Sequence, residues 1–188
     1  MVNAAEKLKV KYVISPECGH AYTAIRWEGP NLMGRQYNFE VIYILELLEQ
    51  LKREGRIKTD GKDERAITFH DPCQIVRRGG VLQQPEELLN SVAGNVTLMP
   101  DSGMWNWCCG GGGGVSANER AEPLKLKAFN RKKRQLEATG ADTLVTACAN
   151  CRIVLEEGLE ENEMEVEVIG LTELLAEYLE EKKEAGES

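Results

Sequence analysis

Short apolar stretches of four or five residues recur along the chain, separated by longer stretches of mixed polarity. Each short stretch is rich in β-branched or aromatic residues, which is typical of a buried β-strand. The predicted strands cover residues 10–14, 39–43, 66–70, 95–99, 142–146 and 166–169. Helix-forming segments lie between them, and this regular alternation favours an α/β fold with a mostly parallel sheet.

Amphipathic segments predict the helices. Residues 44–54 place their apolar side chains on one face and end before Gly55, a residue that favours helix termination. Proline at position 123 predicts a kink or break in another helix. Asp71 is the expected N-cap of a short helix that has Pro72 in its first turn. The remaining predicted helices cover residues 21–27, 84–92, 116–138, 152–158 and 171–184.

A weak internal repeat relates the two ends of the sequence. When Cys18 is aligned with Cys151, residues 12–18 match the segment that ends at Cys151, and Ser15 falls on Cys148. The first copy therefore lacks the second cysteine of the pair, and we expect Cys18 to be a buried or spare thiol. A role as a resolving thiol stays open because Cys18 follows a predicted strand.

The repeat also predicts the domain organisation. Residues 39–48 match residues 166–175, in the same order of strand and helix. We therefore expect two tandem Rossmann-like βα modules, a degenerate first copy over residues 1–60 and a complete second copy over residues 61–188. The beginning of the first copy is absent from this sequence, as expected of a fragment or of a shortened protein.

Composition narrows the class of function. The net charge is −8, which argues against a nucleic-acid-binding surface that needs clustered positive charge. No apolar run approaches the ~20 residues that a membrane span requires, and the first residues lack the apolar core of a signal peptide. We expect a cytoplasmic protein whose association with a membrane, if any, depends on another subunit.

The six cysteines carry the most specific signal, and Cys108 and Cys109 are adjacent. A disulfide between neighbours is strained, and five consecutive glycines, residues 110–114, are costly to order inside a helix or strand. This combination indicates two sulfurs and a bare backbone pressed against a bulky group. The glycine run lacks the signatures of a phosphate-binding loop. Metal binding or redox chemistry is expected in place of disulfides.

Predicted topology gathers the cysteines. Cys18, Cys73 and Cys148 each follow a predicted strand, and the Cys108–Cys109 pair follows another. Because ligands of parallel sheets collect at the carboxyl ends of the strands, we expect these sulfurs at one rim. A metal–sulfur cluster is the first hypothesis. A tetrahedral zinc site is the alternative, and it would leave one of five cysteines unexplained.

The order Cys73, then Cys108-Cys109-Gly110, then Cys148-x-x-Cys151 resembles the cysteine-rich CCG domain. That domain occurs in heterodisulfide reductase subunits, in glycolate- and lactate-oxidising iron–sulfur subunits, and in redox complexes of sulfate reducers. A single intact motif looks closest to the Dsr-type K subunit of sulfate reducers. The ferredoxin-like cysteine run of longer relatives is absent from this sequence.

The resemblance implies a [4Fe–4S] cluster, non-cubane in several family members, bound by Cys73, Cys108, Cys109, Cys148 and Cys151. It also implies an oxidoreductase that reduces a small-molecule or protein disulfide. Electrons would come from other subunits of a redox complex, such as a ferredoxin-like protein or a membrane cytochrome. Cys73, Cys108, Cys109 and His70 are then the catalytic candidates. A non-catalytic electron-transfer or assembly module is the alternative.

The sequence leaves more than one role possible for several residues near the five cysteines. The backbone N–H groups of Gly110, Gly111 and Gly112 are expected to face cluster sulfides. His70 is either a turn residue bonded to the backbone or a donor to a cluster sulfur, and His20 is a weaker candidate for the same part. The side chains of Trp105 and Trp107 are expected to pack the loop and exclude water. The basic run at residues 131–134 is interpreted as a solvated helix face, or as a docking site for an acidic partner.

Overall fold

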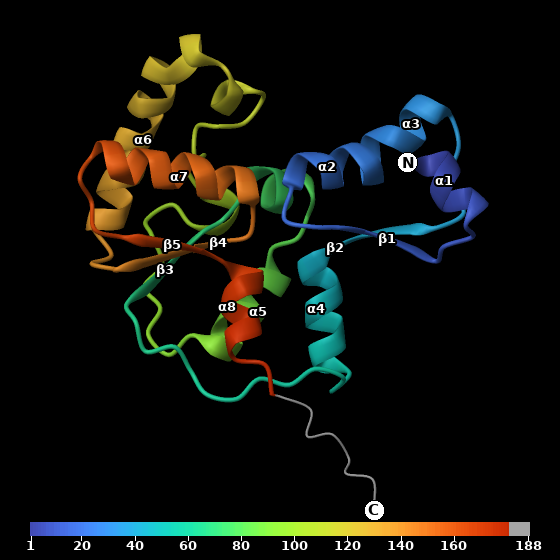
Figure 1. The fold of residues 1–188 in the computed structure, drawn as a ribbon, viewed down its shortest axis with the longest axis horizontal. Coiled ribbons are helices and arrows are strands. Elements are labelled where there is room, and N and C mark those ends of the chain that lie inside the picture. The colour runs from blue at the N-terminus through green and yellow to red at the C-terminus, as the bar shows by residue number, and fades with distance from the viewer. Residues whose placement is uncertain (181–188) are drawn as a thin grey trace, which may run out of the picture.

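The structure is a computed structural model that describes residues 1–180. It contains two separate parallel sheets, one near each end of the chain. Figure 1 shows the larger sheet and its helices beside the smaller sheet, whose strands point toward the larger one. The predicted α/β fold with parallel strands is confirmed. None of the helices in the described residues is long and apolar enough to cross a membrane.

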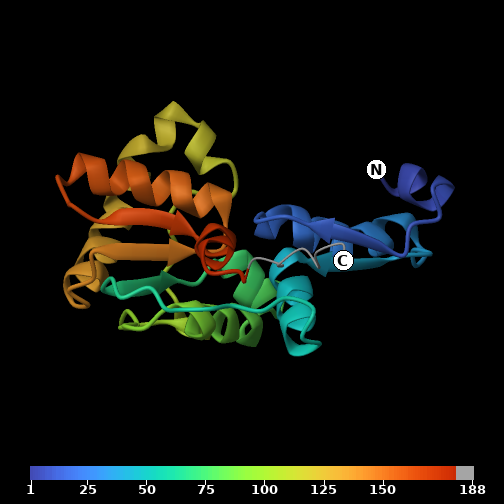
Figure 2. The same ribbon diagram turned by 60° about the horizontal axis from the view of Figure 1, so that its bottom comes forward.

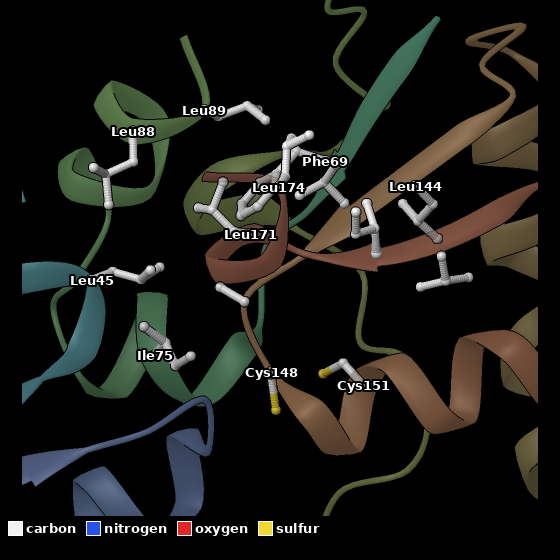
Figure 3. Close-up of a cluster of buried hydrophobic side chains, with 14 of the residues drawn as sticks. Leu45, Phe69, Ile75, Leu88, Leu89, Leu144, Cys148, Cys151, Leu171 and Leu174 are labelled. Carbon is white, nitrogen blue, oxygen red and sulfur yellow. The ribbon is translucent and has the colours of Figure 1, made fainter. Parts of the chain in front are cut away.

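The larger sheet has the strand order β3 (Ile67–His70), β4 (Thr143–Thr146), β5 (Glu167–Gly170). The first two strands are buried along their whole length because helices cover both faces. One face carries α6 (Glu122–Glu137) and α7 (Ala149–Glu161), and the other carries α5 (Gln83–Val92) and α8 (Leu171–Glu177) (Figure 1). Figure 3 shows the leucines of α5 and α8 packed together in this core.

The strands of this sheet end level with one another. His70 pairs with Thr146 in the parallel register, and Thr146 pairs with Gly170. The three carboxyl ends therefore form one edge. The helices and loops that follow the strands start from this edge, which places their first residues side by side.

The smaller sheet joins β1 (Tyr12–Ser15) to β2 (Glu40–Tyr43). Three stretches of helix run consecutively between them: α2 (Gly19–Thr23), a π-helical turn (Ala24–Glu28) and α3 (Gly29–Met33). The other helices of this part are α1 (Val2–Lys7) and α4 (Ile44–Arg53). The prediction that the helix stops before Gly29 was wrong, because Pro30 occupies the first turn of α3, where its missing N–H is harmless.

The first predicted strand differs from expectation in its burial. Tyr12 and Ile14 are exposed, whereas Ser15 is buried. The sheet has only two strands, and α2 and α3 cover one of its faces (Figure 2). Alternate side chains of β1 therefore remain at the surface, and the prediction of a buried strand was wrong.

The structure shows the internal repeat, but it aligns the two copies differently from the sequence comparison. β2 leads directly into α4 as β5 leads into α8, and both helices begin with a glutamate, Glu46 or Glu173, that accepts a hydrogen bond from the backbone N–H of the N-cap residue. Cys18 and Cys148 are both N-cap residues in extended conformation. Cys18 thus corresponds to Cys148, and the predicted alignment of Cys18 with Cys151 was wrong by three positions. The division into two domains stays a prediction.

Three further expectations need correction. Residues 95–99 form only one bridge, between Val96 and Ile67, because the chain turns away from the sheet before Pro100, which has no N–H for a ladder. The helix predicted from residue 116 begins only at Glu122, after two short 3₁₀ turns, so the break predicted at Pro123 is confirmed and Pro123 lies in the first turn of α6. The last helix ends at Glu177, and the end predicted for it at residue 184 lies outside the described residues.

Close packing of α6 against α7 depends on Gly158. A Cβ atom at this position would lie 2.2 Å from Cδ2 of Phe129, whose side chain is fully buried. We expect Gly158→Ala to lower the free energy of unfolding by about 1–3 kcal/mol through overpacking. The gain in helix propensity, about 1 kcal/mol, offsets only part of this loss. Urea unfolding measures the difference, and a more stable variant would contradict the packing described here.

Candidate metal centre

Five cysteines converge at the carboxyl edge of the larger sheet. The sulfurs of Cys73 and Cys108 are 4.0 Å apart. Further thiol contacts link Cys108 to Cys109, Cys109 to Cys151, and Cys151 to Cys148. Cys148 is the N-cap of α7 and Cys151 lies in its first turn, so their sulfurs point to the same end of that helix (Figure 3). All five are free thiols. The structure therefore brings together the five cysteines selected from the sequence.

These sulfurs hold their protons unequally. The thiols of Cys109 and Cys73 donate to the Cys108 sulfur and lower the pKa of Cys108 to about 2. In turn, the contact with Cys108 raises the pKa of Cys109 to about 11. The contact of Cys73 with Cys108 also raises the pKa of Cys73. The Cys151 thiol and nearby backbone N–H groups lower the pKa of Cys148 to about 6. The contacts therefore favour the thiolate form at Cys108 and Cys148, and metal binding would displace the protons of the other sulfurs.

His70 faces this group of sulfurs from the end of β3. Its side chain is 0% exposed, and neither ring nitrogen has a hydrogen-bond partner among residues 1–180. A ring nitrogen of His70 and the sulfurs of Cys109 and Cys151 lie within 4.8 Å of one another. Burial lowers the pKa of His70 well below its ordinary value, so the ring is neutral and has one N–H to donate. The interpretation as a turn histidine bonded to the backbone was wrong.

The glycine run packs against α6 and α7 near their N-terminal ends. The N–H of Gly110, a residue with a φ of 95°, donates to the Cys108 sulfur at 3.3 Å. A Cβ atom at Gly111 would lie 2.3 Å from Cγ2 of Val154 on α7. The N–H of Gly111 also donates to the Cys109 sulfur. Bare backbone is therefore needed at these positions, both for the φ value and for the close approach.

Three side chains anchor the loop that carries Cys108 and Cys109. The Asp71 carboxylate accepts a hydrogen bond from the Gly103 N–H at 2.7 Å, and the Asn106 amide donates to the Asp71 carbonyl. Asn150, between Cys148 and Cys151, donates to the Gly111 carbonyl at 3.3 Å. Asp71 thus holds the loop, and its prediction as a helix N-cap was wrong. Asn150 was missed, although a polar residue between two paired cysteines was a signal.

The smaller sheet contributes directly to the centre. The Gly19 N–H, at the start of α2, donates to the Cys148 sulfur. The Ala149 N–H donates to the Glu17 carbonyl at 2.8 Å, and the Tyr43 hydroxyl donates to the Ala147 carbonyl. The carboxyl ends of β1 and β2 therefore support the loop between β4 and α7. Neither Glu17 nor Tyr43 stood out in the sequence.

A pocket opens from the sulfurs toward the surface, and exposed His20 of α2 lies at its rim beside Gly112. Its lining comprises His20, Pro72, Cys73, Gln74, Cys108, Cys109, Gly112, Cys148, Asn150 and Cys151. Cys18 lies apart and lines a separate pocket with Glu17, Ile44 and Thr172. The structure thus places Cys18 outside the group of five sulfurs.

Two surface predictions around the loop were wrong. Trp105 is 84% exposed and does not exclude water from the loop. Trp107 is 40% exposed, although its indole N–H donates to the Ala128 carbonyl at 3.3 Å and Arg131 lies 4.4 Å above its ring. Lys132 was assigned to a solvated helix face, yet its side chain is 1% exposed. It shares one face of α6 with buried Phe129 and Leu136, at the helical spacing that would have revealed its position.

The donor set suits a soft metal centre. Sulfur atoms dominate the pocket, and no carboxylate lines it among the described residues. Thiolates select iron–sulfur clusters or zinc, and unpaired N–H groups such as that of His70 commonly bond to cluster or thiolate sulfur. Zinc takes four ligands, whereas five sulfurs are present. The residues fit an iron–sulfur cluster and fit a single zinc ion less completely.

Comparison with known proteins gives a match over the same residues. Residues 67–156 match the family model described as the cysteine-rich domain, CCG. A dihydromethanophenazine:CoB–CoM heterodisulfide reductase subunit of Methanosarcina acetivorans is 31% identical over 179 residues, which cover 95% of this chain and 42% of that protein. The protein of the same name from Methanosarcina barkeri is 34% identical, over 95% of this chain and 43% of that protein.

A third relative comes from a different redox system. The EtfAB:quinone oxidoreductase of Syntrophomonas wolfei is 32% identical over 153 residues, which cover 79% of this chain and 21% of that protein. The chain spans less than half the length of these curated relatives.

Proposed function

We propose that this chain, whose residues 67–156 match the family model of the cysteine-rich domain, CCG, is an iron–sulfur redox subunit or domain that delivers electrons to a disulfide. Its [4Fe–4S] cluster, cubane or non-cubane, is held by Cys73, Cys108, Cys109, Cys148 and Cys151. The observation that carries the proposal is the convergence of five free thiols, joined by successive contacts, around an unpartnered buried histidine. The names of the relatives support a role in redox catalysis.

Each part of the site has a task in this proposal. When bound, the cluster would take up electrons one at a time and offer iron to a substrate sulfur. With the cluster bound, neutral His70 would donate its otherwise unpartnered N–H to a sulfur of the centre and stabilise negative charge there. The N–H groups of Gly110 and Gly111 stabilise the Cys108 and Cys109 sulfurs as thiolates. Asn150 and Asp71 keep the glycine loop closed over the site.

The exposed rim provides the route for substrate and protons. Cleavage of a disulfide breaks one S–S bond, consumes two electrons and two protons, and yields two thiols. The electrons come from a reduced partner subunit of the ferredoxin or cytochrome class. His20 is the one titratable side chain besides the cysteines that lines the described pocket, so it is placed to hold a proton for the departing thiolate.

A second function is favoured by one observation. His70, Cys109 and Cys151 offer three donors within 4.8 Å of one another, which is a plausible core for a zinc ion. In that case the domain would be a non-catalytic module in which metal fixes the fold of a larger redox complex. The same alternative includes a module whose iron–sulfur cluster passes electrons on without reducing a substrate.

A disulfide-reduction assay separates catalysis from relay. The reconstituted chain is supplied anaerobically with a reduced viologen dye and a small disulfide, and released thiol is counted. The proposal predicts catalytic thiol release that depends on the reconstituted chain. Oxidation of the dye without thiol, at full cluster content, would favour the relay module.

A further inference from the structure

Lys132 is the one lysine or arginine that is buried among residues 1–180. It lies on the face of α6 that also carries Lys125 and Ala128, the residues that a Cβ atom at Gly110 would meet. The single hydrogen bond of its ammonium in the described structure goes to the Met99 sulfur, at 3.9 Å. A thioether sulfur is a weak acceptor, and no described carboxylate forms an ion pair with Lys132. The mechanism proposed above makes no use of this group.

A buried ammonium without a carboxylate partner is costly. Burial accordingly lowers the pKa of Lys132 to about 8, and its attraction to Cys109, Asp71, Cys108 and Cys151 in their ionised forms acts against that shift. Three of these four groups are cysteines of the metal centre. The Asp71 carboxylate is engaged with the Gly103 N–H, and burial raises the pKa of Asp71, which weakens its value as a counter-ion.

Other candidates for a counter-charge are poorly placed. His70 is buried and neutral, so it offers a dipole and no net charge. Arg77 lies near Cys73 but is exposed, and water screens its field. Lys132 is shielded from solvent, and interactions between charges are strongest where water is excluded.

We propose that Lys132 is a positioning residue for the redox chemistry, a buried positive charge that stabilises the cluster with its thiolates and raises its reduction potential. This inference rests on the proposed function. A cluster bound by five thiolates is negatively charged, and each added electron increases that charge. A fixed ammonium nearby favours the reduced form, because potentials of iron–sulfur centres follow local charge, hydrogen bonding and exposure.

Redox titration of the reconstituted full chain tests the inference. Lys132→Met keeps the length and apolar stem of the side chain and removes the charge. Arg134→Met removes an equal charge from the exposed face of the same helix and is the matched control. We expect the midpoint potential, followed by electron paramagnetic resonance, to become more negative in Lys132→Met and to stay near the wild-type value in Arg134→Met. Equal potentials in all three proteins would overturn the inference.

Lys132→Arg keeps the test decisive if Lys132→Met loses the cluster. We expect Lys132→Arg to retain the cluster at a potential near that of the wild type, because the charge is preserved. Loss of the cluster in both variants would mean that the packing of the lysine stem, and not its charge, is required, and the inference would fail. If the wild-type chain itself takes up no cluster, the failure belongs to the proposed function.

Discussion

Cys109→Ser is expected to abolish stable cluster binding. Cys109 contacts the sulfurs of both Cys108 and Cys151, and its sulfur lies within 4.8 Å of a ring nitrogen of His70. Its removal therefore divides the group of sulfurs in two, and a serine hydroxyl is a poor ligand for iron in such a centre. Iron and acid-labile sulfide per chain after anaerobic reconstitution measure the loss, which should exceed tenfold.

Cys18→Ser is the matched control for this variant. Cys18 is a half-buried cysteine near the end of β1, and it lines a separate pocket. We expect its replacement to leave iron and sulfide contents at wild-type values. Equal losses in the two variants would contradict the assignment of the five sulfurs. Retention of the full cluster in Cys109→Ser would contradict it as well.

The second large effect is expected from Gly111→Ala. A Cβ atom at this position would meet Cγ2 of Val154 at 2.3 Å and Nδ2 of Asn150 at 3.2 Å. Val154 is buried in α7, and its β-branched side chain has few rotamers that would relieve the clash. The glycine loop must then shift away from α7 and take the Cys109 sulfur away from the Cys151 sulfur. We expect at least a tenfold loss of bound iron, with the far-ultraviolet circular dichroism of the chain unchanged.

Gly112→Ala tests whether this loss is specific. Neither Gly111 nor Gly112 has a positive φ, so backbone strain does not distinguish them. A Cβ atom at Gly112 would meet only His20, at an ordinary contact distance of 3.5 Å. We expect Gly112→Ala to retain more cluster than Gly111→Ala, and the reverse order would show that packing against Val154 is not what restricts the loop.

Several features of the site followed from simple rules of sequence. The apolar runs before Cys73 and Cys148 predicted strands, and the carboxyl-end rule for parallel sheets then placed both cysteines at one edge. The adjacent cysteines and the glycine run indicated close backbone contact, which the packing of Gly111 against Val154 now explains. Such local signals are strong because only a few residue types satisfy them.

Other features depend on contacts between distant segments. Lys132 belongs to a basic run that is typical of a surface, and its burial is decided by the way α6 packs over the glycine loop. Burial of β1 failed as a prediction because composition does not tell how many faces of a sheet are covered. Residues 95–99 have the composition of a strand, but only one bridge forms before Pro100.

The contribution of the smaller sheet to the site also depends on contacts between distant segments, which the sequence does not reveal. Cys18, which follows a strand of this sheet, lies outside the group of five sulfurs. The N–H of Gly19 nevertheless donates to the Cys148 sulfur, and His20 lines the pocket beside the sulfurs. The internal repeat revealed the kinship of the two halves. Their arrangement, in which the strands of the smaller sheet point toward the larger sheet, could be seen only in three dimensions (Figure 2).

Metal analysis of the full chain, purified and reconstituted anaerobically with iron, sulfide and zinc all present, tests the central claim most directly. We expect about four iron and about four sulfide per chain, together with the absorbance of an iron–sulfur cluster. Stoichiometric zinc with neither iron nor sulfide would contradict it and would make the five cysteines a structural zinc site.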